Sequence, residues 1–82
     1  MTMYTIKTTP SEADAILRGD KMFVFRADAP QFVTGNNIAF AVIDERRVTP
    51  HPLEDRVFKI THIERGEPIA DGIIAVGFIR IK

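Results

Sequence analysis

The segment GDKMFVFRAD, residues 19–28, holds the side chains that could bind or process a ligand. Lys21 opens the segment and Arg26 nearly closes it, with large apolar residues between them. A lysine acts as a nucleophile or base only where burial or a partner base removes its proton. Val24, at the centre of the segment, supplies neither a base nor a hydroxyl. These residue types therefore favour binding over catalysis.

The two histidines do not have the neighbours that a metal site requires. His51 lies between two prolines, and His62 alternates with Ile60 on a predicted strand, where we expect it to be partly buried. A metal site needs three or four ligands, and no cysteine or closely spaced second histidine accompanies either residue. Thr9 and Ser11 lie at the start of a helix, where hydroxyl groups usually cap, so we expect no catalytic triad. Neither a metal nor a cofactor is predicted.

One helix is predicted over residues 10–18, in the stretch TPSEADAILRG. Thr9 fits the N-cap, Pro10 the first helical position and Glu12 the third, which together form a capping box. Gly19 suits the position after the helix because it adopts a positive φ without a Cβ clash. The helix is therefore short, with clear signals at both ends.

The remaining elements are predicted to be strands over residues 3–8, 20–27, 38–44, 56–64 and 72–81, and the segment 46–55 is predicted to be a surface excursion. The order β-α-β-β-β-β gives an α+β class that is mostly β, in one domain over residues 1–82. A flat sheet with one short helix would leave an apolar face exposed to solvent. We therefore expect a closed five-stranded barrel with the helix at one open end. Its core is predicted to contain Phe23, Phe40, Phe58 and Phe78.

Composition restricts the function classes further. The 82 residues are 45% hydrophobic, contain no cysteine, and carry 11 basic and 11 acidic residues. No run approaches the roughly 20 apolar residues of a membrane span, and the first residues lack the pattern of a signal peptide, so a cytoplasmic setting is the default expectation. Zero net charge weighs against strong non-specific binding of nucleic acid, although a local basic cleft remains compatible with it.

Four aromatic residues could stack on bases, as they do in proteins that bind single-stranded RNA: Tyr4, Phe23, Phe25 and Phe32. Phenylalanines at strand spacing belong more often to a core. Burial is therefore the expectation for this group, with base stacking as the alternative.

The order strand, TP, helix, ILRGDKMFVFR, loop, VTGNNIAF resembles the ASCH domain of the PUA-like superfamily. Lys7, Lys21 and Arg26, together with two glycines, agree with its pattern of a first-strand lysine and a later G-x-K-x-x-E-x-R. The segment RVFKITHIERGEPIADGIIAVGFI is similar to a short phage and bacterial branch of unknown function. Val24 departs from the pattern, where the family usually has Glu, and Asn36 stands where it usually has Asp.

The resemblance implies a non-enzymatic domain that binds RNA or a nucleotide-like ligand beside residues 20–27. The implied ligand-binding residues are Lys7, Lys21, Arg26, Phe23 and Tyr4. One alternative is a phage or prophage accessory protein that acts through protein–protein contact, and homodimer formation is left open. Another is a degenerate relative of the members that hydrolyse acylated cytidines. Those members have Thr at position 24 and a Glu on a later insertion, which this shorter chain lacks, so activity as an enzyme is not favoured.

Overall fold

The computed structural model describes residues 3–82. Within them the chain forms six strands, one α-helix and one short 3₁₀ helix. In order these are β1 (Met3–Thr8), α1 (Pro10–Arg18), β2 (Phe23–Ala27), β3 (Asn37–Asp44), β4 (Arg47–Val48), η1 (Pro52–Asp55), β5 (Phe58–Glu64) and β6 (Ile73–Arg80). The predicted α+β class, mostly β with one helix between the first two strands, is confirmed.

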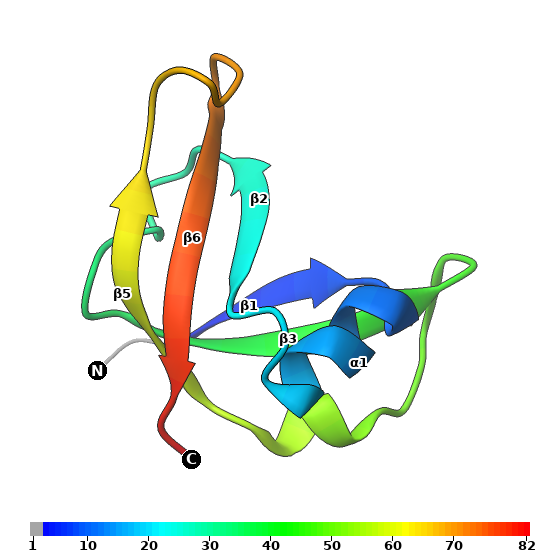
Figure 1. Ribbon diagram of the computed structural model, residues 1–82. Coiled ribbons are helices and arrows are strands. Elements are labelled where there is room, and N and C mark those ends of the chain that lie inside the picture. The colour runs from blue at the N-terminus through cyan, green and yellow to red at the C-terminus, as the bar shows by residue number, and fades with distance from the viewer. Residues whose placement is uncertain (1–2) are drawn as a thin grey trace.

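The strands form one strongly curved sheet in the order β1-β3-β5-β6-β2, and β4 pairs with β3 outside this path. β1 runs parallel to β3, and the other pairs are antiparallel. In Figure 1, β5, β6 and β2 stand upright, whereas β1 and β3 run across their lower ends. The prediction of a closed five-stranded barrel was wrong in strand number and in closure, because β1 and β2 are the two edges of the sheet and do not pair with each other.

The extra strand β4 arises from a tight turn that the sequence does not signal. Glu45 and Arg46 have positive φ angles of 49° and 67°, and the flanking residues Asp44 and Arg47 pair across the turn. Two-residue hairpin turns with positive φ at both positions usually contain Asn or Gly. The segment 46–55 was therefore predicted to be a surface excursion without a strand.

Three phenylalanines form the centre of the core. The rings of Phe40, Phe58 and Phe78 lie 5.2–5.4 Å apart between centroids, and each side chain is at most 2% exposed. Phe23 was predicted to join them, but it is 44% exposed. On β2 the fully buried Val24 points inward, so its neighbours in the strand must point outward.

The strand β5 contains an irregularity that changes the direction of His62. The register with β6 shifts between Ile60 and His62, as in a β-bulge. The His62 side chain is consequently 69% exposed and lies 2.8 Å from Glu64. The prediction that His62 is partly buried was wrong because simple alternation was assumed along the whole strand.

The helix α1 has the predicted ends and packs against β3 and η1. Thr9 Oγ1 accepts the hydrogen bond of the Glu12 backbone N–H at 3.2 Å, and Gly19 ends the helix with a φ of 83°. Ala13 and Ile16 are its buried residues. The helix therefore holds its first turn beside the end of β1.

None of the helices in residues 3–82 is long and apolar enough to cross a membrane.

Candidate functional site

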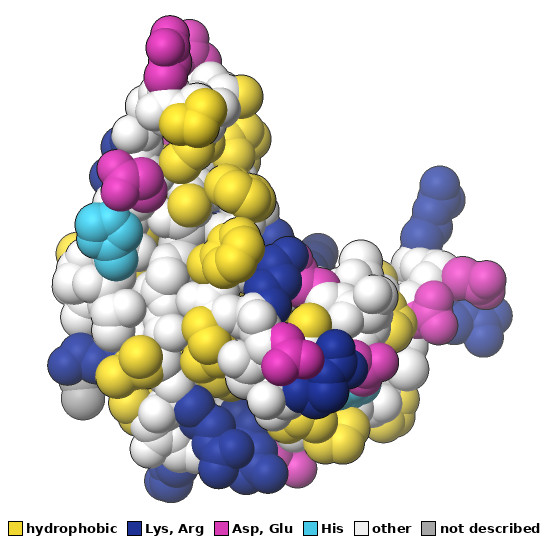
Figure 2. Space-filling view, in the orientation of Figure 1, with side chains coloured by type: hydrophobic (Ala, Val, Ile, Leu, Met, Phe, Trp, Pro, Cys, Tyr) yellow, Lys and Arg dark blue, Asp and Glu magenta, His cyan; other side chains and the backbone are white. Residues whose placement is uncertain are grey.

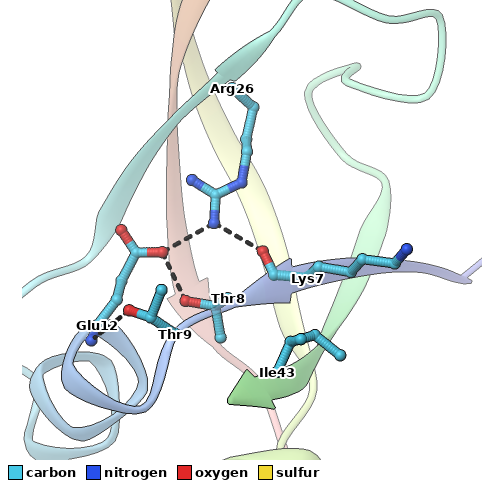
Figure 3. A pocket seen from close by; sticks show the side chains of 6 residues that line it. All are labelled: Lys7, Thr8, Thr9, Glu12, Arg26 and Ile43. Carbon is cyan, nitrogen blue, oxygen red and sulfur yellow. Dashed lines mark hydrogen bonds and ion pairs between the residues drawn. The ribbon is translucent and has the colours of Figure 1, made fainter. Parts of the chain in front are cut away.

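Three side chains from β1, β2 and the turn before β2 converge on the carboxylate of Glu12; Figure 3 shows those of Thr8 and Arg26. Oε1 accepts hydrogen bonds from Thr8 Oγ1 at 2.6 Å and from Arg26 Nη2 at 2.8 Å. Oε2 accepts from Lys21 Nζ at 2.8 Å. We call these four residues the Glu12 cluster. It ties the helix to both edge strands of the sheet.

Local sequence explains how Glu12 comes to this position. The Thr9 cap places Glu12 in the first turn of α1, directly above the end of β1. At the other end of the helix, Gly19 reverses the chain so that Lys21 returns to the same carboxylate. In a capping box the Glu side chain would reach back to the N-cap backbone. Here the carboxylate instead accepts hydrogen bonds from three other side chains.

The cluster holds Glu12 as an anion over a wide pH range. The side chain is only 17% exposed. Burial alone would raise the pKa of Glu12, but the hydrogen bonds from Arg26, Lys21 and Thr8 outweigh it and lower the pKa from 4.5 to about 2. Two cations therefore share one carboxylate, and the cluster keeps a single excess positive charge.

The structure brings together only part of the predicted site. Lys21 and Arg26, two of the predicted ligand-binding residues, both contact Glu12. Lys7 contributes its backbone oxygen, which accepts from Arg26 Nη2 at 2.9 Å, while its side chain extends away from Glu12 (Figure 3). Tyr4 is partly buried against the core.

The aromatic residues that were predicted to be buried are only partly so. Phe32 is buried, as expected, whereas Phe23 and Phe25 are 44% and 51% exposed, so their predicted burial was wrong. Their rings pack edge to face, 5.7 Å apart between centroids, and Lys21 Nζ lies 5.4 Å from the Phe23 centroid. We call Lys21, Phe23 and Phe25 the β2 aromatic surface.

The neighbouring strand leaves these rings accessible. Phe23 and Phe25 lie opposite Gly77 and Ala75 of β6, the smallest residues of that strand. Opposite residues in an antiparallel pair point to the same face of a sheet. Figure 2 shows hydrophobic side chains gathered along β2 and β6, with a basic side chain at their lower end. Directly opposite the two rings, therefore, β6 presents no large side chain to a flat ring that approaches this face.

A cleft of about 470 Å³ opens between the two edge strands (Figure 3). It is lined by Lys7, Thr8, Thr9, Glu12, Arg26 and Ile43. A second hollow lies beyond Arg26 and Lys7, towards Ala29 and Phe32. The hydrogen bond from Arg26 to Lys7 therefore divides a longer groove between β1 and β2. Among residues 3–82, no three metal-binding side chains gather at this groove or elsewhere.

The residue that sequence reasoning missed is Glu12. Its position in the T-x-x-E pattern was fully explained by helix capping. The available signal was indirect: Lys21 and Arg26 were both expected to bind a ligand beside residues 20–27, where Val24 replaces the usual acidic residue. Two neighbouring cations in a partly buried site require a counter-charge. In this fold the helix supplies it.

No family model matches this chain, and no curated protein matches it either. The resemblance to the ASCH domain therefore remains a prediction. The geometry of the Glu12 cluster and of the β2 aromatic surface carries the functional argument.

Proposed function

We propose that this protein is a non-enzymatic binding domain of the ASCH and PUA-like type that takes single-stranded RNA on its β2 aromatic surface. The observation that carries the proposal is the exposed Phe23–Phe25 pair with Lys21 at its end. Bases stack on such rings, and a lysine beside them can contact the phosphate of the same nucleotide. The ligand would be a few nucleotides long, because the surface contains only two aromatic rings.

The strength of this contact is expected to come from stacking more than from charge. Stacking contributes about 1–3 kcal/mol for each base. Lys21 and Arg26 already share Glu12, so little positive charge remains for phosphates. The zero net charge of the chain points in the same direction. Because little free positive charge is available, we expect binding to be weak and only mildly dependent on salt.

The chemistry of the cluster disfavours hydrolysis. Thr8 Oγ1 donates to Glu12 as a nucleophile donates to a general base. A carboxylate with a pKa of about 2, however, binds a proton too weakly to act as an efficient base at neutral pH. Val24, in the position of the family's acidic residue, is fully buried in the core. Thr8 and Glu12 are therefore better explained as a structural pair.

The proposal is tested by fluorescence anisotropy with a labelled hexamer of uridine and one of adenosine. Phe23→Ala and Phe25→Ala should each weaken binding about tenfold, because each removes one stacking platform. Val48→Ala is the matched control, since Val48 is exposed on β4, away from this surface. Equal affinity of Phe23→Ala, Phe25→Ala and the unmodified protein would refute the proposal, as would absence of binding at low salt.

Protein–protein contact is the second candidate, and the free edge of β2 favours it. Hydrogen bonds from Phe78 to Met22 and from Asp28 to Gly72 mark the positions at which β2 pairs with β6. By alternation, the backbone groups of Phe23 and Phe25 point away from β6. Another strand could add to this edge. Light scattering separates the two candidates, because a mass above the monomer that falls on substitution Phe25→Ala would indicate self-association.

A further inference from the structure

A partly enclosed pocket of about 200 Å³ lies beside the turn between α1 and β2, and Gly19 and Met22 of that turn line it. Three arginines from separate parts of the chain line it: Arg18 at the end of α1, Arg56 just before β5, and Arg80 at the end of β6. We call it the arginine pocket. Figure 2 shows Lys and Arg side chains gathered near the lower end of β6, where these elements meet. None of the residues of the Glu12 cluster lines this pocket.

Arg56 has an unused hydrogen-bond donor at this place. Its Nε atom is buried, and no acceptor lies within hydrogen-bonding distance among residues 3–82. A buried donor without an acceptor destabilises a protein, so natural structures rarely retain one. The Nε–H and one terminal N–H of a guanidinium form the two-pronged edge that carboxylates and phosphates bind. The pocket therefore offers a donor that an oxyanion would satisfy.

The positive charge of the pocket is poorly compensated within the described residues. Arg18 forms an ion pair with Asp20, in which both side chains are more than 60% exposed. In residues 3–82, neither Arg56 nor Arg80 forms an ion pair. No Asp or Glu lines the pocket. An anion entering it would meet at least two guanidinium groups without a competing carboxylate.

The rest of the lining is apolar. Ile16 and Leu17 come from α1, Met22 precedes β2, and Phe58 starts β5, directly opposite Arg80 in the sheet register. Pockets for drug-sized ligands have about 300–1,000 Å³. This smaller pocket has room for an oxyanion group and a short apolar substituent. Its mixed lining matches such a molecule better than a bare inorganic ion.

We propose that the arginine pocket binds a small organic anion, a phosphate or carboxylate attached to a short apolar group. The oxyanion accepts hydrogen bonds from Arg56 and Arg80, and the apolar group packs against Leu17 and Met22. Arg18 adds a cation at the rim. The proposal does not rest on nucleic-acid binding, because the pocket and the β2 aromatic surface have no residue in common.

The side-chain Nε–H signals of the arginines in a ¹⁵N-labelled sample report this site directly. Three probes are titrated: inorganic phosphate, phenyl phosphate and benzoate. We expect a saturable shift of the Arg56 signal, with phenyl phosphate or benzoate binding more tightly than inorganic phosphate. Tighter binding of phenyl phosphate would assign the oxyanion as a phosphate, and tighter binding of benzoate would assign it as a carboxylate.

Variants test whether the shift arises from this pocket. Arg80→Gln, at an exposed position on β6, should weaken binding of the better probe about tenfold through loss of a charge-assisted hydrogen bond. Arg56→Gln should do the same, and its fold is checked by circular dichroism. Arg47→Gln on β4 is the control that keeps the overall charge change equal.

Three results would count against the proposal. One is an Arg56 signal that does not shift at millimolar probe concentrations. Another is a shift that grows without saturation and is equal for all arginines, because that behaviour indicates general ion screening. Unchanged affinity in Arg80→Gln would also count against it, since this variant leaves Arg56 and its buried Nε atom in place. Binding of oligonucleotides to the β2 aromatic surface is measured separately and does not decide this question.

Discussion

Arg26 on the edge strand β2 donates from Nη2 to the backbone oxygen of Lys7 on the opposite edge strand β1, at 2.9 Å. The same nitrogen lies 2.8 Å from Glu12. The Arg26 side chain thus connects β1 and β2, the two edge strands that backbone hydrogen bonds do not join. Arg26 is 25% exposed, so these contacts are only partly screened by solvent. The sheet is closed at this point by a side chain rather than by strand pairing.

Arg26→Ala should lower the free energy of unfolding by about 1–3 kcal/mol, because it leaves Glu12 with fewer donors in a partly buried site. Urea denaturation followed by circular dichroism measures the change. Arg26→Lys should recover only part of it, since an ammonium cannot reproduce the geometry of the guanidinium. Arg47→Ala, on the exposed strand β4, is the control and should stay within about 0.5 kcal/mol. A loss in Arg26→Ala no larger than in this control would show that the bridge does not stabilise the fold.

Stability should fall on acidification between the two pKa values of Glu12. Its pKa is lowered from 4.5 to about 2 in the folded protein, so the unfolded chain binds a proton first as the pH falls. The contribution of Glu12 is therefore complete above about pH 4.5 and is lost progressively towards pH 2. Thermal unfolding at a series of pH values measures it. Glu12→Gln should be less stable at pH 7 and should show a smaller drop over this range.

An equal drop in Glu12→Gln and in the unmodified protein would assign the acid sensitivity to other carboxylates. Asp28 is the nearest competitor, because its hydrogen bonds with Arg65 lower its pKa too. Asp28→Asn separates the two contributions. Asp28 and Arg65 lie at the surface, so we expect this variant to change the profile less than Glu12→Gln does.

The salt dependence of RNA binding should be small. Each phosphate contact to a single strand adds roughly 0.7 to the slope of log affinity against log salt concentration. Sequence reasoning placed three cations at the site, which implies a slope near two. Because Glu12 neutralises part of that charge and Lys7 points away, we now expect a slope of about one. Anisotropy titrations at several salt concentrations measure it.

Glu12→Gln is the informative variant for this slope. It frees Lys21 and Arg26 from their shared carboxylate, so the slope and the affinity at low salt should both increase. Lys21→Gln should reduce the slope towards zero. A decrease in affinity on substitution Glu12→Gln, in a protein that remains folded, would contradict the assignment of Lys21 as the phosphate contact.

Acylated cytidines should not be hydrolysed above background by the purified protein. Val24 is buried and has no functional group, and Glu12 binds protons too weakly to act as a base at neutral pH. Liquid chromatography of substrate and product measures the turnover. Robust hydrolysis that disappears in both Lys21→Ala and Thr8→Val would overturn the reading of Thr8 and Glu12 as a structural pair.

The helix and the central core could be predicted from the sequence because their causes are local or follow from strong patterns. Thr9, Pro10 and Gly19 set the ends of α1 through hydrogen bonds and backbone angles within a few residues. Phe40, Phe58 and Phe78 are buried because they lie on the inward faces of three strongly apolar strands, whose burial alternates along the chain. The order and approximate bounds of the five longer strands follow from the same apolar runs and the turns between them.

The tertiary structure decided the features that depend on contacts between distant residues. Phe23 points outward because the inward position of β2 is taken by Val24, and which face of this apolar strand meets the core depends on how the sheet packs. A one-residue bulge turned His62 to solvent, since it reverses the alternation beyond it. Above all, Glu12 became the centre of the site only when the fold brought Arg26 to it, 14 residues away along the chain. Spacing in a sequence predicts partners on one element, whereas the pairing of charges across elements depends on how those elements pack.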